Sequence, residues 1–154
     1  KNEKKYSIFR IAKTYGDELN DNTLITNYLK NILIGQKKFI VASDQFFSPL
    51  FLGDLKKIIK IFTKKKINGI FNVGGPERLS RYDCLCNVNK FLNKKLKNEV
   101  NLKKIRLENF SFYDKRPLDV SMSIKKLNKV INFKMTKIKK IAKKVVEKNR
   151  LNEK

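Results

Sequence analysis

Polar residues that could bind a ligand follow predicted strands at three places along the chain. The three groups are Tyr15-Gly16, the stretch Asp44-Gln45-Phe46-Phe47-Ser48-Pro49, and Arg116-Pro117-Leu118-Asp119. Open α/β sheets bind their ligands at the carboxyl ends of the strands, so the three loops together predict a binding site. Taken alone, the Arg-Pro-x-Asp stretch also fits a rigid turn closed by a local ion pair, and the residues leave that alternative open.

Catalytic groups of the common kinds are missing from the sequence. The chain has no histidine, so the usual Ser-His or Cys-His nucleophile pair cannot be built. No group of carboxylates has a spacing typical of a metal site, so we predict none. Gly74-Gly75-Pro76 lies between a predicted strand and a predicted helix, where backbone amides can bind phosphate. Because the proline removes a donor, a structural turn is the favoured interpretation.

The two cysteines and the ends of the chain bear on the compartment. Cys84 and Cys86 are two residues apart and point in nearly opposite directions on a helix, so we expect no disulfide and no shared metal. They fit small, partly buried residues in a reducing cytoplasm. No apolar run reaches the length that spans a bilayer, and residues 1–12 lack the pattern of a signal peptide. We therefore predict a cytoplasmic protein that does not enter a membrane.

The formal net charge of +23 requires an explanation. A nucleic-acid-binding module is one alternative, because clustered cations release counterions from phosphates. Of the 37 basic residues, however, all but six are lysine, and base recognition favours arginine. The lysines are also scattered along the chain, with at least one on every predicted helix. A solvated lysine-rich surface is therefore the favoured interpretation.

Apolar periodicity predicts alternating strands and helices, and hence an α/β fold with some parallel pairing. The expected helix signals are a cap at Asp21 or Asn22, a stop at Gly35, a capping box from Ser80 to Asp83 and a cap at Thr136. The expected strands, of which the first is suited to burial, are at 6–12, 39–42, 70–73 and, more weakly, 103–107; the expected helices are at 24–33, 52–62, 81–92, 123–127 and 138–145.

Five stretches in the same order resemble the C-terminal portion of dTDP-4-dehydrorhamnose reductases and related extended short-chain dehydrogenases. They are FRIAKTYG at 9–16, DQFFSP at 44–49, GDL at 53–55, GIFNVGGP at 69–76 and RPLDVS at 116–121. The resemblance implies the C-terminal part of a Rossmann-type fold, with the last parallel strands and a small α/β substrate-binding region. It also implies that residues 1–154 are the substrate-binding portion of a longer reductase whose N-terminal part binds NADPH or NADH.

The resemblance assigns roles to individual residues. Tyr15 and Gly16 would close over the nicotinamide end of the cofactor. Gln45, Ser48 and Pro49 would line the sugar-nucleotide pocket. Arg116 would meet the diphosphate of the substrate, and Asp119 would orient its loop. The Gly-rich cofactor turn and the Tyr-x-x-x-Lys pair of the family do not occur in this sequence, so no catalytic residue is expected in the chain.

Three departures from the family pattern concern the substrate. Lys13 stands where the rhamnose reductases have tryptophan, Phe47 replaces a glycine, and Leu50 replaces a threonine. The resemblance therefore implies reduction of a 4-keto nucleotide sugar and leaves the base and the sugar open. A non-catalytic regulatory subunit of the same family is the alternative. The expected partners are the nucleotide sugar and the N-terminal half of the same protein, and the oligomeric state stays open, with a homodimer among the options.

Overall fold

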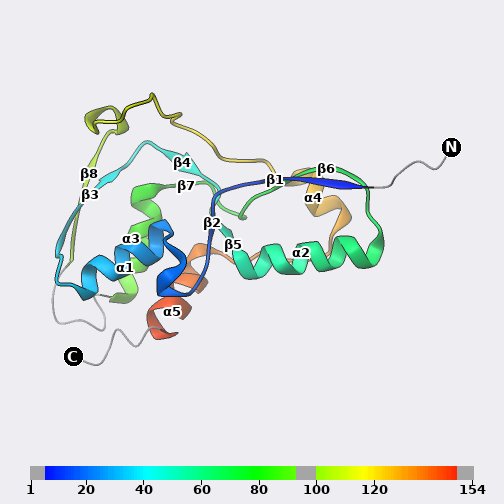
Figure 1. Ribbon diagram of the computed structural model, residues 1–154, viewed down its shortest axis with the longest axis horizontal. Helices are drawn as coiled ribbons and strands as arrows, with labels where there is room; N and C mark the ends of the chain where they lie inside the picture. Colours follow the sequence, from blue (N-terminus) through cyan, green and yellow to red (C-terminus); the bar gives the residue numbers. More distant parts are fainter. Residues whose placement is uncertain (1–5, 93–99, 149–154) are drawn as a thin grey trace.

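Strands and helices alternate along the chain and form an α/β fold (Figure 1). The computed structural model describes residues 6–92 and 100–148. In chain order the elements are β1 (Ser7–Ile11), β2 (Thr14–Tyr15), the 3-10 turn η1 (Leu19–Asp21), α1 (Leu24–Leu33), β3 (Lys38–Ala42), β4 (Phe46–Phe47), β5 (Leu50–Phe51), α2 (Leu52–Lys65), β6 (Gly69–Val73), β7 (Leu79–Ser80), α3 (Arg81–Leu92), β8 (Asn101–Ile105), the 3-10 turn η2 (Leu107–Asn109), α4 (Lys125–Val130) and α5 (Ile138–Lys148).

One half of the molecule, on the right in Figure 1, is built on the parallel pair β1 and β6. The two strands pair over all five residues of each. Helices α2 and α4 pack their apolar side chains into one core with β6. Phe62 of α2 contacts both strands edge to face, because its ring centroid lies 4.8 Å from that of Phe9 and 4.9 Å from that of Phe71.

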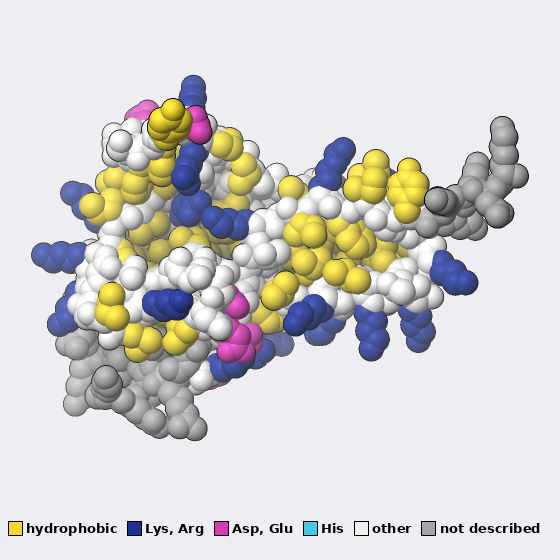
Figure 2. Space-filling model, viewed as in Figure 1, with side chains coloured by type: hydrophobic (Ala, Val, Ile, Leu, Met, Phe, Trp, Pro, Cys, Tyr) yellow, Lys and Arg dark blue, Asp and Glu magenta, His cyan; other side chains and the backbone are white. Residues whose placement is uncertain are grey.

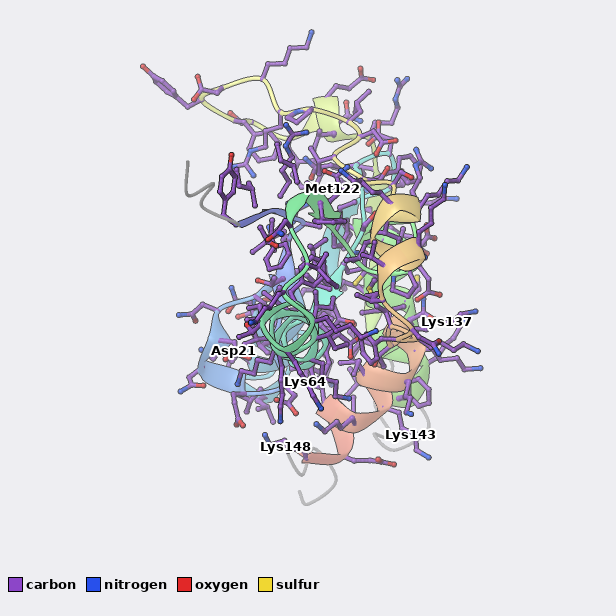
Figure 3. All side chains as sticks on the ribbon, turned by 90° about the vertical axis from the view of Figure 1, so that its right-hand side faces the viewer. Asp21, Lys64, Met122, Lys137, Lys143 and Lys148 are labelled. Carbon is purple, nitrogen blue, oxygen red and sulfur yellow. The ribbon has the colours of Figure 1, made fainter. Side chains whose placement is uncertain are left out.

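The other half packs helices α1, α3 and α5 together beside the parallel pair β3 and β8. Leu29, Val88 and Val145, one from each of the three helices, are fully buried in this second core. On α5 the apolar stripe faces this core, while its lysines lie on the outside; Figure 3 shows Lys143 and Lys148 there. None of the helices in the described residues is long and apolar enough to cross a bilayer.

Two short strand pairs lie where the halves meet. β2 pairs in parallel with β5, and β4 pairs antiparallel with β7, with Phe46 opposite Ser80. The segment after β8 returns across the top of the molecule to α4 (Figure 1), and on the way an isolated bridge joins Phe46 to Asp119. The chain around residues 45, 81 and 116–119 therefore converges on β4.

The predicted α/β class with parallel pairing is confirmed, and so are several helix signals. Gly35 follows α1 with a φ of +92°, which favours glycine. The capping box is present, because the amide of Asp83 donates to the Ser80 hydroxyl at 3.0 Å and the amide of Ser80 donates to the Asp83 carboxylate at 3.3 Å. The chain thus enters α3 with the amides of Ser80 and Asp83 satisfied.

The predicted cap of α1 is wrong. Thr23 caps the helix, and its hydroxyl accepts a hydrogen bond from the amide of Thr26 at 3.4 Å. Asn22 has a left-handed φ of 52° and ends the preceding turn, which contains Asp21. A threonine that also fits the helix interior gives a weaker signal than Asp or Asn, and this explains the error.

The boundaries of two weaker elements also differ from the prediction. The strand expected at 103–107 is β8, Asn101–Ile105, and the short helix expected at 123–127 is α4, Lys125–Val130. At the start of α5, the amide of Ile138 donates to the Glu77 carboxylate at 2.8 Å. The expected cap, Thr136, instead donates to Asp54. Long-range carboxylates take the place of the local cap at this helix.

The strand expected at 6–12 is only partly buried. Ile8 and Ile70 face each other in the register of β1 and β6 and are 45% and 44% exposed. Phe71, whose side chain points to the opposite face, is buried against α2 and α4. The helices therefore cover one face of the strand pair, and isoleucines remain on the other.

Candidate functional site

A cavity of about 430 Å³ lies between α1, β3, the start of α3 and the segment after β8. Its apolar lining includes Phe39, Leu85, Leu107, Phe110 and Phe112. Asn27 and Asn31 of α1 add amide groups. Figure 2 shows basic side chains gathered over a hollow with an apolar floor in the left-hand half of the molecule. A cavity of this size with an apolar lining and a few polar groups is typical of a small-molecule site.

Three cations, Lys13, Arg81 and Arg116, line the cavity, and no carboxylate does so among the described residues. Burial, and then the charges of the two arginines, lower the pKa of Lys13. Burial, and then the charge of Arg116, lower the pKa of Arg81. The three groups therefore lie close enough to repel one another. An anion in the cavity would relieve that repulsion.

The buried Gln45 connects two of the segments that line the cavity. Its side-chain oxygen accepts a hydrogen bond from Nε of Arg81, and its side-chain amide donates to the carbonyl of Pro117 at 3.2 Å. The backbone amide of Arg81 also donates to the carbonyl of Gln45 at 3.1 Å. This arrangement follows from the antiparallel pairing of β4 with β7, because Gln45 directly precedes β4 and Arg81 directly follows β7.

The loop that carries Arg116 is fixed to β4 by backbone hydrogen bonds. The amide of Phe46 donates to the carbonyl of Leu118 at 2.6 Å, and the amide of Val120 donates to the carbonyl of Phe46 at 3.0 Å. The guanidinium of Arg116 stacks on Phe112, with its central carbon 4.1 Å from the ring centroid. The loop is exposed, yet these hydrogen bonds hold its main chain against β4.

Asp119 makes an ion pair in this loop, but its partner is Arg78 rather than Arg116. The Arg78 guanidinium donates to one carboxylate oxygen of Asp119 at 2.8 and 3.0 Å and lies over the Phe46 ring. The local ion pair that the sequence left open is therefore replaced by a long-range one, and Arg116 has no carboxylate partner among the described residues. Asp119 itself does not line the cavity.

Ser48 and Pro49 are buried beside the cavity and do not line it. The Ser48 hydroxyl accepts from the amide of Met122 at 3.1 Å, and its carbonyl accepts from the amide of Gly75 at 3.2 Å. A Cβ on Gly75 would lie 1.8 Å from the carbonyl oxygen of Pro49. Gly74-Gly75 is thus a turn that lets two backbone segments approach closely, as the favoured interpretation has it.

Tyr15 and Gly16 are also buried. The Tyr15 ring is 4% exposed and packs in the core beside Phe51, and its hydroxyl has no hydrogen-bond partner among the described residues. Burial raises the pKa of Tyr15. A Cβ on Gly16 would meet the carboxylate of Asp21 at 1.8 Å. The side chains present here do not form a cofactor site by themselves.

Of the residues expected at the binding site, Gln45 and Arg116 line the cavity. Arg81, which also lines it, and Arg78, which pairs with Asp119, were not predicted. Arg81 directly follows the capping residue Ser80, at a junction of strand and helix. Arginine is rare in this lysine-rich chain, so its position there was a usable signal. The described residues contain no group of His, Cys, Asp or Glu that could hold a metal ion.

Comparisons with known proteins identify relatives of this fold. The family model described as RmlD substrate binding domain matches residues 1–151. No curated protein sequence matches the chain significantly. Among solved structures, dTDP-4-dehydrorhamnose reductase from Bacillus anthracis str. Ames, solved in complex with NADP, is similar with a TM-score of 0.80 and 19% identity over 94% of this chain and 49% of that one.

Two further structures show how widely the fold is shared. The reductase of the same name from Yersinia enterocolitica has a TM-score of 0.79 and 18% identity, over 92% of this chain and 48% of that one. UDP-N-acetylglucosamine 4-epimerase from Bacillus cereus has a TM-score of 0.68 and 20% identity, over 94% and 48%. This chain spans about half the length of these structures.

Proposed function

Because the chain belongs to the RmlD substrate binding domain family, we propose that it supplies the nucleotide-sugar pocket of a longer NAD(P)H-dependent reductase that acts on a 4-keto nucleotide sugar. The observation that carries the proposal is the cavity itself, in which cations and aromatic rings occur together without a carboxylate among the described residues. Guanidinium groups suit a diphosphate, and aromatic rings suit a base or a sugar face.

The residues of this chain bind and orient the substrate in this proposal. Arg116 meets the diphosphate, and Gln45 lines the pocket and holds the loop after Arg116 through Pro117. Ser48 and Pro49 support the pocket from the side, and Asp119 fixes the Arg116 loop through Arg78. The nicotinamide cofactor supplies the hydride, and a tyrosine outside this chain donates the proton to the C4 oxygen.

The cofactor binds mainly to other parts of the full-length protein in this proposal. The Tyr15 ring is committed to the core, so the contact of Tyr15-Gly16 with the nicotinamide end is proposed for the main chain of that loop. The matched reductase from Bacillus anthracis is a complex with NADP, which supports a nicotinamide cofactor. NADPH and NADH both remain candidates.

The outer face of the β1 and β6 pair is the proposed contact with the N-terminal half. Ile8 and Ile70 lie side by side on this face, each nearly half exposed. β1 pairs with β6 along one edge, and within the described residues no strand pairs with its other edge. The open edge favours pairing with a further strand, and the exposed isoleucines on the face favour packing against another part of the full-length protein. The coverage of about half of each matched structure supports this partner.

The decisive experiment compares this chain with the product of its complete reading frame. We expect the complete product to carry a Gly-rich cofactor turn and a Tyr-x-x-x-Lys pair, and to oxidise NADPH or NADH with a 4-keto nucleotide sugar. We expect the 154 residues alone to bind nucleotide and not to oxidise either cofactor. Oxidation by the 154 residues alone would contradict the proposal. A complete frame without the Tyr-Lys pair would instead favour the regulatory subunit.

A further inference from the structure

The cavity holds more positive charge than a single arginine contact requires. Lys13, Arg81 and Arg116 share it, and no described carboxylate lies in its lining. By contrast, Arg78 pairs with Asp119, and Arg106 pairs with Asp44 and Glu108. The two arginines of the cavity have no such carboxylate partner among the described residues. Their charge is therefore available to a ligand.

Arg81 is the cation whose position is set most firmly by the protein. Its Nε donates to the side-chain oxygen of Gln45, which is 7% exposed and whose other end is held by Pro117. No hydrogen bond within the described residues uses the two terminal nitrogens of Arg81. A guanidinium held at Nε presents these two donors side by side, which is the geometry that suits two oxygens of a phosphate.

The lysine bias of the chain does not account for this group. Lysines occur on every α-helix of the described residues, but only six residues of the chain are arginine, and two of them line this cavity. Placing a glutamine in the protein interior has a cost unless both of its ends are bonded. Both ends of the Gln45 side chain are hydrogen-bonded in this structure, and one of the two bonds orients Arg81.

We propose that Arg81, oriented by the buried Gln45, is a second diphosphate-binding arginine, and that with Lys13 and Arg116 it makes the cavity select a diphosphate over a monophosphate. The inference rests on the proposed function, because it concerns the same pocket. It goes further by naming the residues that set the charge preference. Three cations match the charge of a diphosphate better than that of a monophosphate.

The experiment measures binding of dTDP, dTMP, thymidine and inorganic pyrophosphate to the 154-residue chain by calorimetry in about 0.15 M salt. The variants are Arg81→Gln, Arg116→Gln and, as matched control, Arg10→Gln on β1, which removes the same charge outside the cavity. We expect Arg81→Gln to lower the affinity for dTDP and for pyrophosphate by about 10-fold or more, and the affinity for thymidine by less than about twofold. Arg10→Gln should change none of these affinities by more than about twofold.

Gln45→Glu tests the positioning role without changing the size of the side chain. A glutamate would hold Arg81 as an ion pair and cancel its charge, and it would also lose the hydrogen bond that the Gln45 amide donates to the carbonyl of Pro117. We therefore expect the preference for dTDP over dTMP to fall while thymidine binding persists. If Gln45 had only a structural role, the affinities for dTDP, dTMP and thymidine would all fall by the same factor. That result would overturn the positioning role of Gln45.

The outcomes separate the inference from the proposed function. If dTDP binds and depends on Arg116 but not on Arg81, the inference is wrong and the proposed function stands. If Arg10→Gln weakens dTDP as much as Arg81→Gln does, general attraction to a basic surface explains the binding, and the inference is again wrong. If neither dTDP nor pyrophosphate binds to the wild-type chain, the proposed pocket and the inference fail together.

Discussion

The guanidinium of Arg78 donates two hydrogen bonds, of 2.8 and 3.0 Å, to the same carboxylate oxygen of Asp119. The other carboxylate oxygen accepts from the amide of Ser121 at 2.8 Å. The Arg78 guanidinium also lies 3.7 Å from the centroid of the Phe46 ring. One side chain from the segment before β7 thus ties the end of the Arg116 loop to β4.

The first prediction concerns this link and ligand affinity. Arg78→Ala should weaken dTDP binding by about three- to tenfold, because the loop that presents Arg116 loses one of its attachments. The midpoint of thermal unfolding should change little, since an exposed ion pair contributes only about 0–1 kcal/mol. Calorimetry and circular dichroism check the two expectations, with Arg10→Ala as the control. A large loss of stability without loss of affinity would contradict the prediction.

The second prediction concerns pH. Hydrogen bonds from Ser121, and then from Arg78, lower the pKa of Asp119 to about 2. Because the folded pKa lies below the ordinary value of 3.8 for an aspartate, the stabilisation is fully present above about pH 4 and is lost as the pH falls through about 2. Carboxyl carbon NMR titration of Asp119 should show this pKa. Arg78→Ala should raise it only in part, because the contacts with Ser121 remain.

The sequence alone predicted the elements with a clear apolar period and missed those without one. α2 buries three apolar residues and α5 buries five, and such a stripe has a helical period that can be read directly. β4 and β7 have two residues each, which is too short for any period. Their pairing nevertheless places Gln45 opposite Arg81. The central contact of the site therefore depended on a feature that has no sequence signal.

Only some of the predicted site residues point into the cavity. Arg116 and Gln45 lie at the cavity, because the ends of strands come together as expected for an α/β sheet. Ser48 and Pro49 lie in the same loop, but they are buried against Gly74 and Gly75. Sequence order gives the loop, whereas the direction in which each side chain points depends on contacts with segments distant in the chain.

The third prediction concerns the close approach of two backbone segments. Gly75→Ala should lower the free energy of unfolding by about 2–4 kcal/mol, because the new Cβ would lie 1.8 Å from the backbone oxygen of Pro49. Gly35→Ala is the matched control: its Cβ would meet nothing within 4 Å, and only its φ of +92° is unfavourable. That change should cost about 1–2 kcal/mol. Urea unfolding of both variants measures the difference, and equal losses would contradict the predicted contact.

The fourth prediction concerns Asp54, a carboxylate that is 1% exposed in the first turn of α2. It accepts hydrogen bonds from the amide of Thr136 at 2.6 Å and from its hydroxyl at 3.0 Å. The bonds connect α2 to the segment that leads into α5, across the junction of the two cores. Hydrogen bonds to a buried charged acceptor contribute more than neutral ones, about 1.5–3 kcal/mol each.

Asp54→Ala should therefore lower the free energy of unfolding by about 2–4 kcal/mol, because it leaves two donors of Thr136 without their acceptor. Thr136→Val keeps the hydrogen bond from the backbone amide and removes only the one from the hydroxyl, so it should lower the free energy of unfolding by about 1–2 kcal/mol. The matched control is Thr63→Val on the exposed side of α2, whose hydroxyl donates to the carbonyl of Ile59 at 3.0 Å. That change should alter the free energy of unfolding by no more than about 0.5 kcal/mol.

Because Asp54 and Thr136 share the same hydrogen bonds, the double variant should lose less stability in urea unfolding than the sum of the two single variants. Strict additivity would show that Asp54 stabilises α2 through its helix dipole alone and not through Thr136.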